Sequence, residues 1–381
     1  MNNVPEVSVV LPCLNEAMTV GHCVEQALKA LAARGLRGEV IVSDNGSGDG
    51  SPELARKAGA RVVHEPRRGY GSAYLCGIIA ARAPIIVMAD ADNTYDLREI
   101  PRLVAKLHEG YDMVLGSRLG GIILPGAMPW LHRYVGNPIL TGLLNRLFRL
   151  QLQDAHTGLR AFTRAGYDRL ELRTTGMEFA SEMIVSAGQQ RLKVAEVPIT
   201  YHPRAGESKL KTWRDGWRHL RYLMLRSPTH LFLIPGVALV LLGWLPLVAL
   251  TAGPLVVGRF FFDFHYMIAG SAIALLGLQT LTLGVHGKAY LVANNLEHPD
   301  RLMTWLQENF TLERGLLSGL ALLLIGLGFG IRIFIVWAQH GYENLFELRT
   351  GLVALTLAVS GTQVIVAALF LSLLRIQTRN D

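Results

Sequence analysis

The chain has 381 residues, half of them hydrophobic, and a mean hydropathy of +0.30, which excludes an ordinary, wholly soluble enzyme. The formal net charge is +7, and 29 of the 37 Lys and Arg and 22 of the 30 Asp and Glu precede residue 231. The excess positive charge therefore belongs to the first 230 residues, and the remainder is mostly apolar.

Strand and helix patterns alternate over the first 118 residues. The spacing of Val20, Val24, Leu28 and Leu31 predicts a helix over 17–35 that ends on a glycine. Runs of β-forming residues predict strands at 6–12, 38–44, 61–65, 84–90 and 112–118. Such alternation predicts a mostly parallel α/β sheet covered on both faces, and ligands of such sheets collect beyond the carboxyl ends of the strands.

Polar segments follow four of these strands: "PCLNE", "SDNGSGDGS", Asp90-Ala91-Asp92 and "GSR". A dinucleotide-binding fold would place G-x-G-x-x-G after its first strand to hold a pyrophosphate, and this chain has Pro, Asn and Glu there. We therefore expect a diphosphate to be neutralised by a divalent cation instead.

Asp90 and Asp92 are the candidate ligands of that cation. Residues two apart on a strand project to the same side, and carboxylate oxygens suit Mg²⁺ and Mn²⁺. A bare D-x-D more often caps a turn and the next helix. Its place at the end of a strand, beside the other polar segments, favours the metal site.

The stretches "VVLPCLNE", "VSDNGSGDGS", "ADADNTYD", "LGSR" and "HTGLRAF" occur in this order over about residues 5 to 215. They resemble the family-two inverting glycosyltransferases of the GT-A fold, and within them the polyprenyl-phosphate (dolichol-phosphate type) sugar synthases. The resemblance implies a UDP- or GDP-hexose donor, Mg²⁺ or Mn²⁺, and a polyprenyl phosphate acceptor, with no nucleic acid as partner.

The resemblance also implies roles for single residues. The donor would contact Pro12, Glu16, Asp44, Asp90, Ala91, Arg204 and Lys209. Asp92 would be the direct metal ligand, and Arg118 and Arg133 would hold the acceptor phosphate. Relatives often carry Gln where Thr94 stands, and Leu14 replaces an aromatic residue that is common in the family.

Asp154 in "QDAHTGLRAF" has two interpretations. With a sugar hydroxyl as acceptor, this carboxylate would be the expected general base. With a phosphate acceptor the nucleophile is already an anion, so Asp154 would only orient the nucleophile or an arginine. His156 is a second candidate base, although a lone histidine in a loop is more often structural.

Four apolar stretches, at about 231–250, 266–285, 315–337 and 351–374, are long enough to span a bilayer. We therefore expect a GT-A domain over 1–211, an amphipathic juxtamembrane helix over 212–230 and a transmembrane domain over 231–381. Seven basic and two acidic residues within 201–230 predict, by the positive-inside rule, a cytoplasmic catalytic domain and C-terminus at the cell (inner) membrane. Whether the chain forms a homo-oligomer is left open.

Two other classes of protein are ranked lower. A processive or hydroxyl-acceptor polysaccharide glycosyltransferase normally carries Q-x-x-R-W before its spans, and the most similar stretch here, "QQRLK", lacks the tryptophan. A non-enzymatic lipid or polysaccharide export component would not need Asp92.

Overall fold

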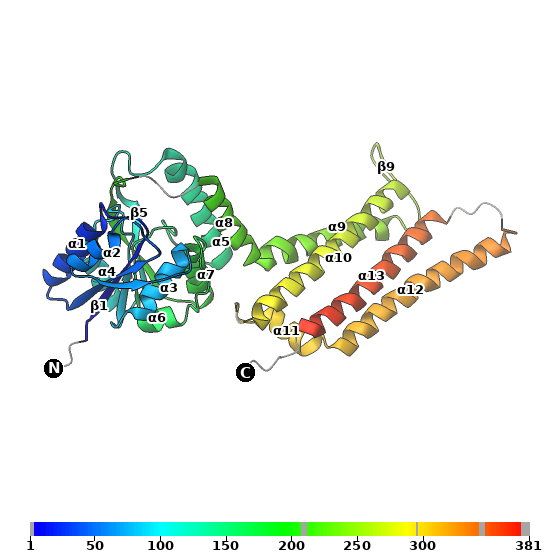
Figure 1. Ribbon diagram of the computed structural model, residues 1–381. Helices are drawn as coiled ribbons and strands as arrows, with labels where there is room; N and C mark the ends of the chain where they lie inside the picture. Colours follow the sequence, from blue (N-terminus) through cyan, green and yellow to red (C-terminus); the bar gives the residue numbers. More distant parts are fainter. Residues whose placement is uncertain (1–3, 207–211, 295, 343–346, 375–381) are drawn as a thin grey trace. The chain divides into compact units, whose positions relative to one another are not determined.

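The computed structural model describes residues 4–206, 212–294, 296–342 and 347–374 (Figure 1). The chain divides into two compact units, Met1–Leu225 and Arg226–Asp381. The first is an α/β domain and the second is helical apart from one short hairpin.

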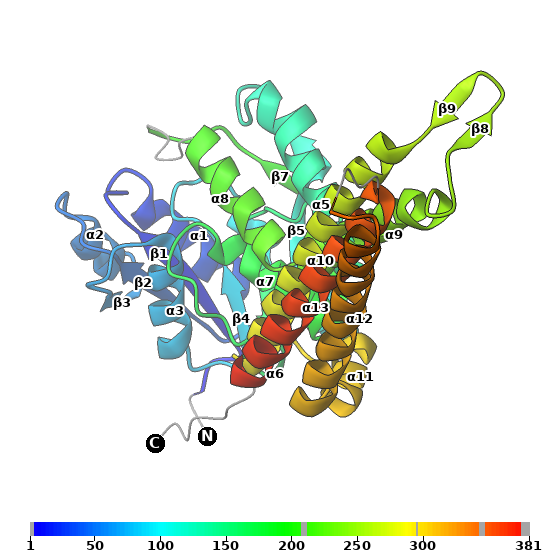
Figure 2. The same ribbon diagram turned by 90° about the vertical axis from the view of Figure 1, so that its right-hand side faces the viewer.

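One mixed sheet forms the centre of the first unit (Figure 2). Its order is β3-β2-β1-β4-β6-β5-β7, and all neighbouring strands are parallel except β6, which runs antiparallel to β4 and β5. The predicted mostly parallel α/β sheet is confirmed, whereas β6 and β7 were not predicted. The strands are β1 Val7–Cys13, β2 Gly38–Asp44, β3 Arg61–His64, β4 Ile85–Met88, β5 Met113–Ile123, β6 Arg160–Thr163 and β7 Val194–Tyr201.

Helices cover both faces of this sheet. Alternate side chains of β1 point to opposite faces, so Val9 and Leu11 pack with α1 and α4, while Val10 packs with α3 and α7. The apolar pattern of the strands thus builds two cores, one on each face. The helices are α1 Val20–Ala32, α2 Ser51–Lys57, α3 Tyr70–Ala80, α4 Ile100–His108, α5 Asn137–Phe148, α6 Arg164–Asp168, α7 Phe179–Gln189 and α8 Thr212–Leu225.

The first residue of β6, Arg160, is fully buried. Its guanidinium donates hydrogen bonds to the carbonyl oxygens of Thr157, Ala180 and Ala155 at 2.9, 2.9 and 3.1 Å. These bonds compensate for the loss of water around a buried charge. They also fix the segment 155–157, which precedes β6, against α7.

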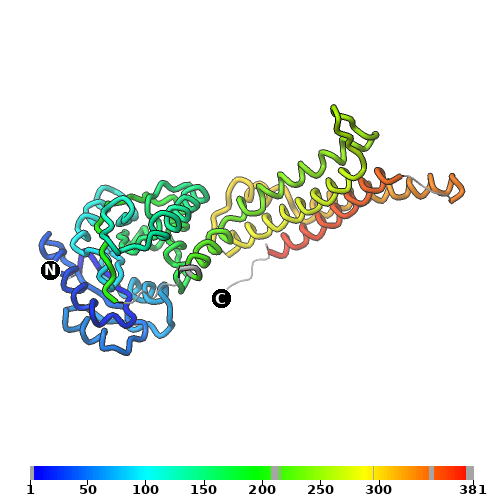
Figure 3. Tube along the Cα trace, turned by 90° about the horizontal axis from the view of Figure 1, so that it is seen from above, coloured from blue at the N-terminus to red at the C-terminus, as the bar shows by residue number. Residues whose placement is uncertain are grey.

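Among the described residues of the second unit, four helices are long and apolar enough to cross a membrane, so the four predicted spans are confirmed. Within it α9 packs on α10, α10 on α13, and α13 on α12 (Figure 3). Glycines allow the close approach: a Cβ on Gly243 would lie 2.2 Å from the backbone nitrogen of Ala274. The elements are α9 Ile234–Ala249, β8 Leu255–Val257, β9 Phe260–Phe262, α10 Phe264–Ala293, α11 Arg301–Asn309, α12 Leu312–Gln339 and α13 Leu348–Leu374.

A buried charge fixes the junction of α10 and α11. Lys288, only 3% exposed, donates from Nζ to Asp300 Oδ2 at 2.5 Å and to Thr229 Oγ1 at 2.9 Å. Asp300 also accepts from the backbone nitrogen of Met303 at 2.9 Å and so caps α11. Asp300 therefore pairs with the lysine and starts the next helix, and Glu297 Oε1 lies 3.7 Å from the same Nζ.

Candidate functional site

The loops after β1 and β2 are joined by hydrogen bonds. The backbone nitrogen of Asn15 donates to Ser47 Oγ, and that of Glu16 donates to Ser51 Oγ, each at 2.9 Å. Asp44, at the end of β2, accepts from the backbone nitrogens of Gly46 and Ser47 at 3.3 and 3.2 Å. The serines and aspartates of "SDNGSGDGS" therefore hold the two loops in one arrangement. Glu16 belongs to the first of these loops, so its backbone is fixed by the same hydrogen bonds.

Asp92 lies just beyond β4 and is buried. Its Oδ1 accepts hydrogen bonds from the backbone nitrogen and the hydroxyl of Thr94 at 3.1 and 2.6 Å. Ala91, between the two aspartates, is held by its carbonyl oxygen, which accepts from Thr19 Oγ1 at 2.7 Å. Thr94 thus orients Asp92 so that Oδ2 faces away from the turn.

The guanidinium of Arg204 lies next to Asp92 Oδ2. Its Nη1 donates to Asp92 Oδ2 at 2.7 Å and its Nη2 donates to Glu16 Oε1 at 2.6 Å. Three residues predicted to contact the donor or the metal are therefore brought together, although Arg204 is more than 100 positions from either carboxylate. Lys209, predicted on the same segment, lies outside the described residues.

Asp90 has a different environment from Asp92. Its Oδ1 accepts from the hydroxyls of Tyr70 and Tyr74 at 3.1 and 3.2 Å. Burial, and then the negative charge of Asp92, raise the pKa of Asp90 to about 6, although the two tyrosine hydrogen bonds oppose this. A Cβ on Gly158 would lie 2.5 Å from Asp90 Oδ2, so glycine is required there.

The two tyrosines were not found from the sequence. Tyr70 and Tyr74 are four residues apart and therefore lie on one face of α3, which is the available signal. Tyr95 and Tyr201 were also missed. The hydroxyl of Tyr95 accepts from the backbone nitrogen of Gly158 at 2.6 Å, and its ring lies 5.2 Å from that of Tyr201.

Arg118 and Asp154 form a buried, bidentate ion pair. Arg118 Nε donates to Asp154 Oδ2 and Nη2 to Oδ1, both at 2.8 Å, and the backbone nitrogen of Arg118 adds a bond at 2.9 Å. Burial alone would raise the pKa of Asp154, but the charge of Arg118 outweighs burial and holds that pKa below its usual range. The Arg118 guanidinium also lies over the ring of Tyr201, 5.3 Å from its centre.

Three further candidates from the sequence, Pro12, Arg133 and His156, lie in separate elements of the domain. Pro12 is in β1, paired with Ser43 of β2. Arg133 is in the turn before α5, with its guanidinium 5.3 Å from the centre of the Tyr134 ring. His156 Nε2 is 3.2 Å from Ser181 Oγ of α7, and Ser181 Oγ lies 2.8 Å from His219 Nδ1 of α8, so Ser181 connects α7 with α8 and His156 with both.

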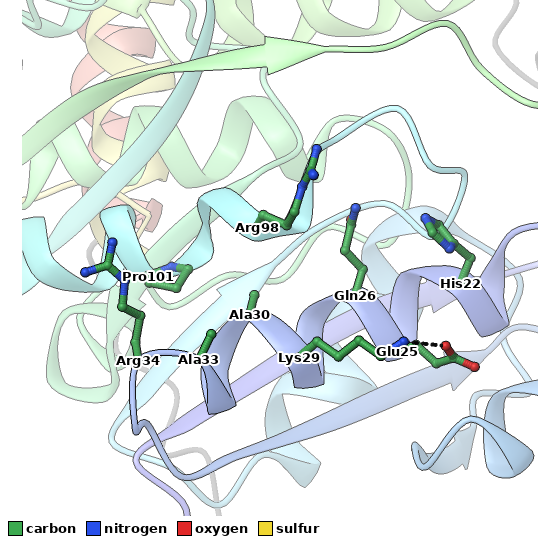
Figure 4. A pocket seen from close by; sticks show the side chains of 9 residues that line it. All are labelled: His22, Glu25, Gln26, Lys29, Ala30, Ala33, Arg34, Arg98 and Pro101. Atoms are coloured by element: carbon green, nitrogen blue, oxygen red, sulfur yellow. Dashed lines mark hydrogen bonds and ion pairs between the residues drawn. The ribbon is translucent and has the colours of Figure 1, made fainter.

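A groove of about 380 Å³ lies elsewhere on the domain, against α1 and the start of α4 (Figure 4). Lys29, Arg34 and Arg98 line it with Glu25, which pairs with Lys29 at 3.0 Å. None of the predicted site residues is among the described residues that line this groove. The chemistry is therefore expected beyond the strand ends and not in this groove.

Comparison with known proteins assigns the family. Residues 8–170 match the family model described as glycosyl transferase family 2, and residues 285–375 match the family 2 C-terminal transmembrane region. The hexosyltransferase Agl6 of low-salt glycan biosynthesis in Haloferax volcanii is 40% identical over 370 residues, which cover 96% of this chain and 88% of Agl6. The chain is a family 2 glycosyltransferase.

Other proteins match a little more than half of this glycosyltransferase. A dolichyl-phosphate hexose transferase of the same organism is 34% identical over 213 residues, which cover 55% of this chain and 89% of the relative. A crystal structure of glucosyl-3-phosphoglycerate synthase from Mycobacterium tuberculosis covers 58% of this chain and 80% of its own, with 24% identity and a TM-score of 0.47. The predicted family is thus confirmed, and the protein is a membrane glycosyltransferase.

Proposed function

We propose that this glycosyltransferase moves a hexose from a nucleotide-sugar to a polyprenyl phosphate. The names of its relatives support both parts, because one is a hexosyltransferase and another a dolichyl-phosphate hexose transferase. The observation that carries the proposal is the buried ion pair of Arg118 and Asp154. The pair leaves Asp154 a poor base and holds the charged Arg118 guanidinium in a fixed position beside Tyr201.

The two possible acceptors need different groups. A hydroxyl acceptor must lose a proton as it attacks, so it needs an accessible base whose pKa is near the working pH. Asp154 is fully buried, its two oxygens are occupied by Arg118, and its pKa is lowered. A phosphate acceptor is already an anion and needs cations to hold it, so Arg118, with Arg133, suits a phosphate better.

A divalent cation suits the residues present. Among the described residues, no three His, Cys, Asp or Glu side chains are grouped so that they could hold a metal ion by themselves. Mg²⁺ and Mn²⁺ are commonly bound by one or two carboxylates plus the phosphates of a substrate. Asp92 Oδ2 and Glu16 Oε1 already share a positive group, the Arg204 guanidinium, so these two oxygens can face a cation.

The reaction then follows from these placements. An oxygen of the acceptor phosphate forms a bond to the anomeric carbon, while the bond from that carbon to the nucleoside diphosphate breaks, with inversion. Negative charge develops on the departing diphosphate. A bound Mg²⁺ or Mn²⁺ would stabilise that charge as a Lewis acid, held by Asp92. Arg118 and Asp154 keep their charges throughout, because no proton has to leave the nucleophile.

The membrane placement is also part of the proposal. Trp217 and Leu225 of α8, with Trp130, Tyr134 and Ile139 around α5, are large apolar side chains that are exposed on the catalytic domain. Aromatic and basic side chains together are typical of an interfacial surface. The positive-inside rule supports a cytoplasmic location of this domain and of the C-terminus at the cell membrane.

One experiment identifies the donor. Membranes that contain the enzyme are incubated with a panel of labelled UDP- and GDP-hexoses, and the lipid fraction is extracted. We expect label in an acid-labile, lipid-linked product with one donor, and loss of that product with excess chelator or with Asp92→Asn. Label that appears only in free sugar, or a folded Asp92→Asn enzyme of full activity, would contradict the proposal.

A further inference from the structure

Arg204 forms two strong hydrogen bonds in a place where a metal ion would be needed. Its Nη1 and Nη2 donate to Asp92 Oδ2 at 2.7 Å and to Glu16 Oε1 at 2.6 Å. Both bonds join charged groups, which makes them stronger than neutral hydrogen bonds. The other oxygen of Asp92 is occupied by Thr94. Arg204 therefore covers the oxygen of Asp92 that a cation would use.

A metal ion on that oxygen would lie close to the Arg204 guanidinium, and repulsion between the two cations makes them compete for Asp92 Oδ2. The guanidinium stays charged at all relevant pH values, so it cannot make room by losing a proton. It can leave only by rotation of its side chain, and it then needs other acceptors. A diphosphate supplies them, since arginine binds phosphate oxygens in a bidentate manner.

We propose that Arg204 is a latch that keeps the metal site of the free enzyme closed until a nucleoside diphosphate arrives. The diphosphate draws the guanidinium from Asp92 and Glu16, and the same diphosphate supplies oxygen ligands to the cation. Metal and donor consequently bind together, each raising the affinity for the other. This inference rests on the metal-dependent function proposed above. It adds that Arg204 links the binding of the metal ion to the binding of the donor.

The latch can be tested by metal binding without turnover. Mn²⁺ binding to the purified full-length enzyme is measured from the electron paramagnetic resonance signal of free Mn²⁺, alone and with UDP or GDP. For the wild-type enzyme we expect weak binding alone and at least about tenfold tighter binding with one nucleotide. In Arg204→Ala we expect about tenfold tighter nucleotide-free binding and a correspondingly smaller effect of the nucleotide.

Arg98→Ala is the matched control, because Arg98 also pairs with a carboxylate beyond β4, Asp96 at 2.7 Å, but does not contact Asp92. It should bind Mn²⁺ as the wild type does. If Arg204→Ala binds nucleotide-free Mn²⁺ no more tightly than the wild type, while the wild type responds to a nucleotide, the latch is wrong and the proposed function stands. If the wild type binds no Mn²⁺ with either nucleotide, the latch and the metal-dependent function are both overturned.

Discussion

Arg118 and Asp154 hold each other in a two-point ion pair, with both side-chain contacts at 2.8 Å and Asp154 fully buried. Arg118 follows Ser117 in β5, where the register with β7 shifts, and Asp154 lies in the segment before β6, so the pair ties this segment to β5. The carboxylate fixes the plane of the guanidinium. Under the proposed function, Asp154 is a positioning residue that acts through Arg118.

Substitution of the two residues should affect the reaction differently. Arg118→Ala removes a charge-assisted contact worth roughly 1.5 to 3 kcal/mol, so transfer to polyprenyl phosphate should fall about 10- to 100-fold. Donor hydrolysis by water does not use that contact and should fall less. Asp154→Asn should reduce transfer only partly, and Arg118→Lys, which keeps the charge but not the two-point geometry, should be intermediate. Transfer and hydrolysis measured side by side check this order.

The same pair predicts a dependence of stability on pH. The pKa of Asp154 is lowered in the folded protein, so its contribution is fully present above the unfolded value of 3.8. It is lost as the pH falls below that value and the carboxylate becomes protonated. Asp154→Asn should therefore be less stable than the wild type at pH 7, and the difference should shrink below about pH 4. Thermal unfolding of the full-length proteins across this range checks it, and a constant difference would contradict it.

The position of the carboxylates at the strand end could be predicted from the sequence because it depends on local residues. Asp90 and Asp92 follow a run of β-forming residues, and such ends meet at one edge of a parallel sheet. The side chains that position them could not be predicted in the same way. Tyr70 and Tyr74 come from a helix, and nothing in a single sequence shows that this helix faces Asp90.

The last two strands were missed for similar reasons. β6 has only four residues and begins with Arg160, a charged side chain that would not be placed in a core. Its carbonyl partners come from Ala155, Thr157 and Ala180, so the burial of Arg160 depends on tertiary structure. Lys288 lies beyond the span predicted at 266–285, whereas α10 continues to Ala293 and buries it.

The Lys288 ion pair predicts a stability effect in the membrane unit. Asp300→Asn keeps the cap of α11 but removes the nearer of two carboxylates beside the buried lysine, while Glu297 remains 3.7 Å from Lys288 Nζ, so the loss should be roughly 1.5 to 3 kcal/mol. Adding Lys288→Met should restore part of that loss, because it removes the buried lysine that has lost its nearer carboxylate but also leaves Glu297 without its lysine partner. Lys106→Met is the control, since Lys106 pairs with Glu109 at the surface. Unfolding in detergent should rank the single Asp300 variant lowest.

The proposed topology can be tested by labelling. In a functional background without Cys13, Cys23 and Cys76, a membrane-impermeant thiol reagent is added to intact cells. Arg259→Cys, between β8 and β9, should be labelled because this hairpin is expected on the outer side. Gln307→Cys on α11 should be labelled only after the cells are opened. The reverse pattern would show that the catalytic domain is not cytoplasmic.

The nature of the acceptor is the central claim, and one comparison tests it directly. The purified enzyme receives its labelled nucleotide-hexose with either polyprenyl phosphate or the polyprenol of the same chain length, which differ only in the phosphate. The arrangement of Arg118 and Asp154 predicts rapid transfer to the phosphate and none above background to the alcohol. Transfer to polyprenol at a similar rate, abolished by Asp154→Asn, would show that the acceptor is a hydroxyl and that Asp154 is its base.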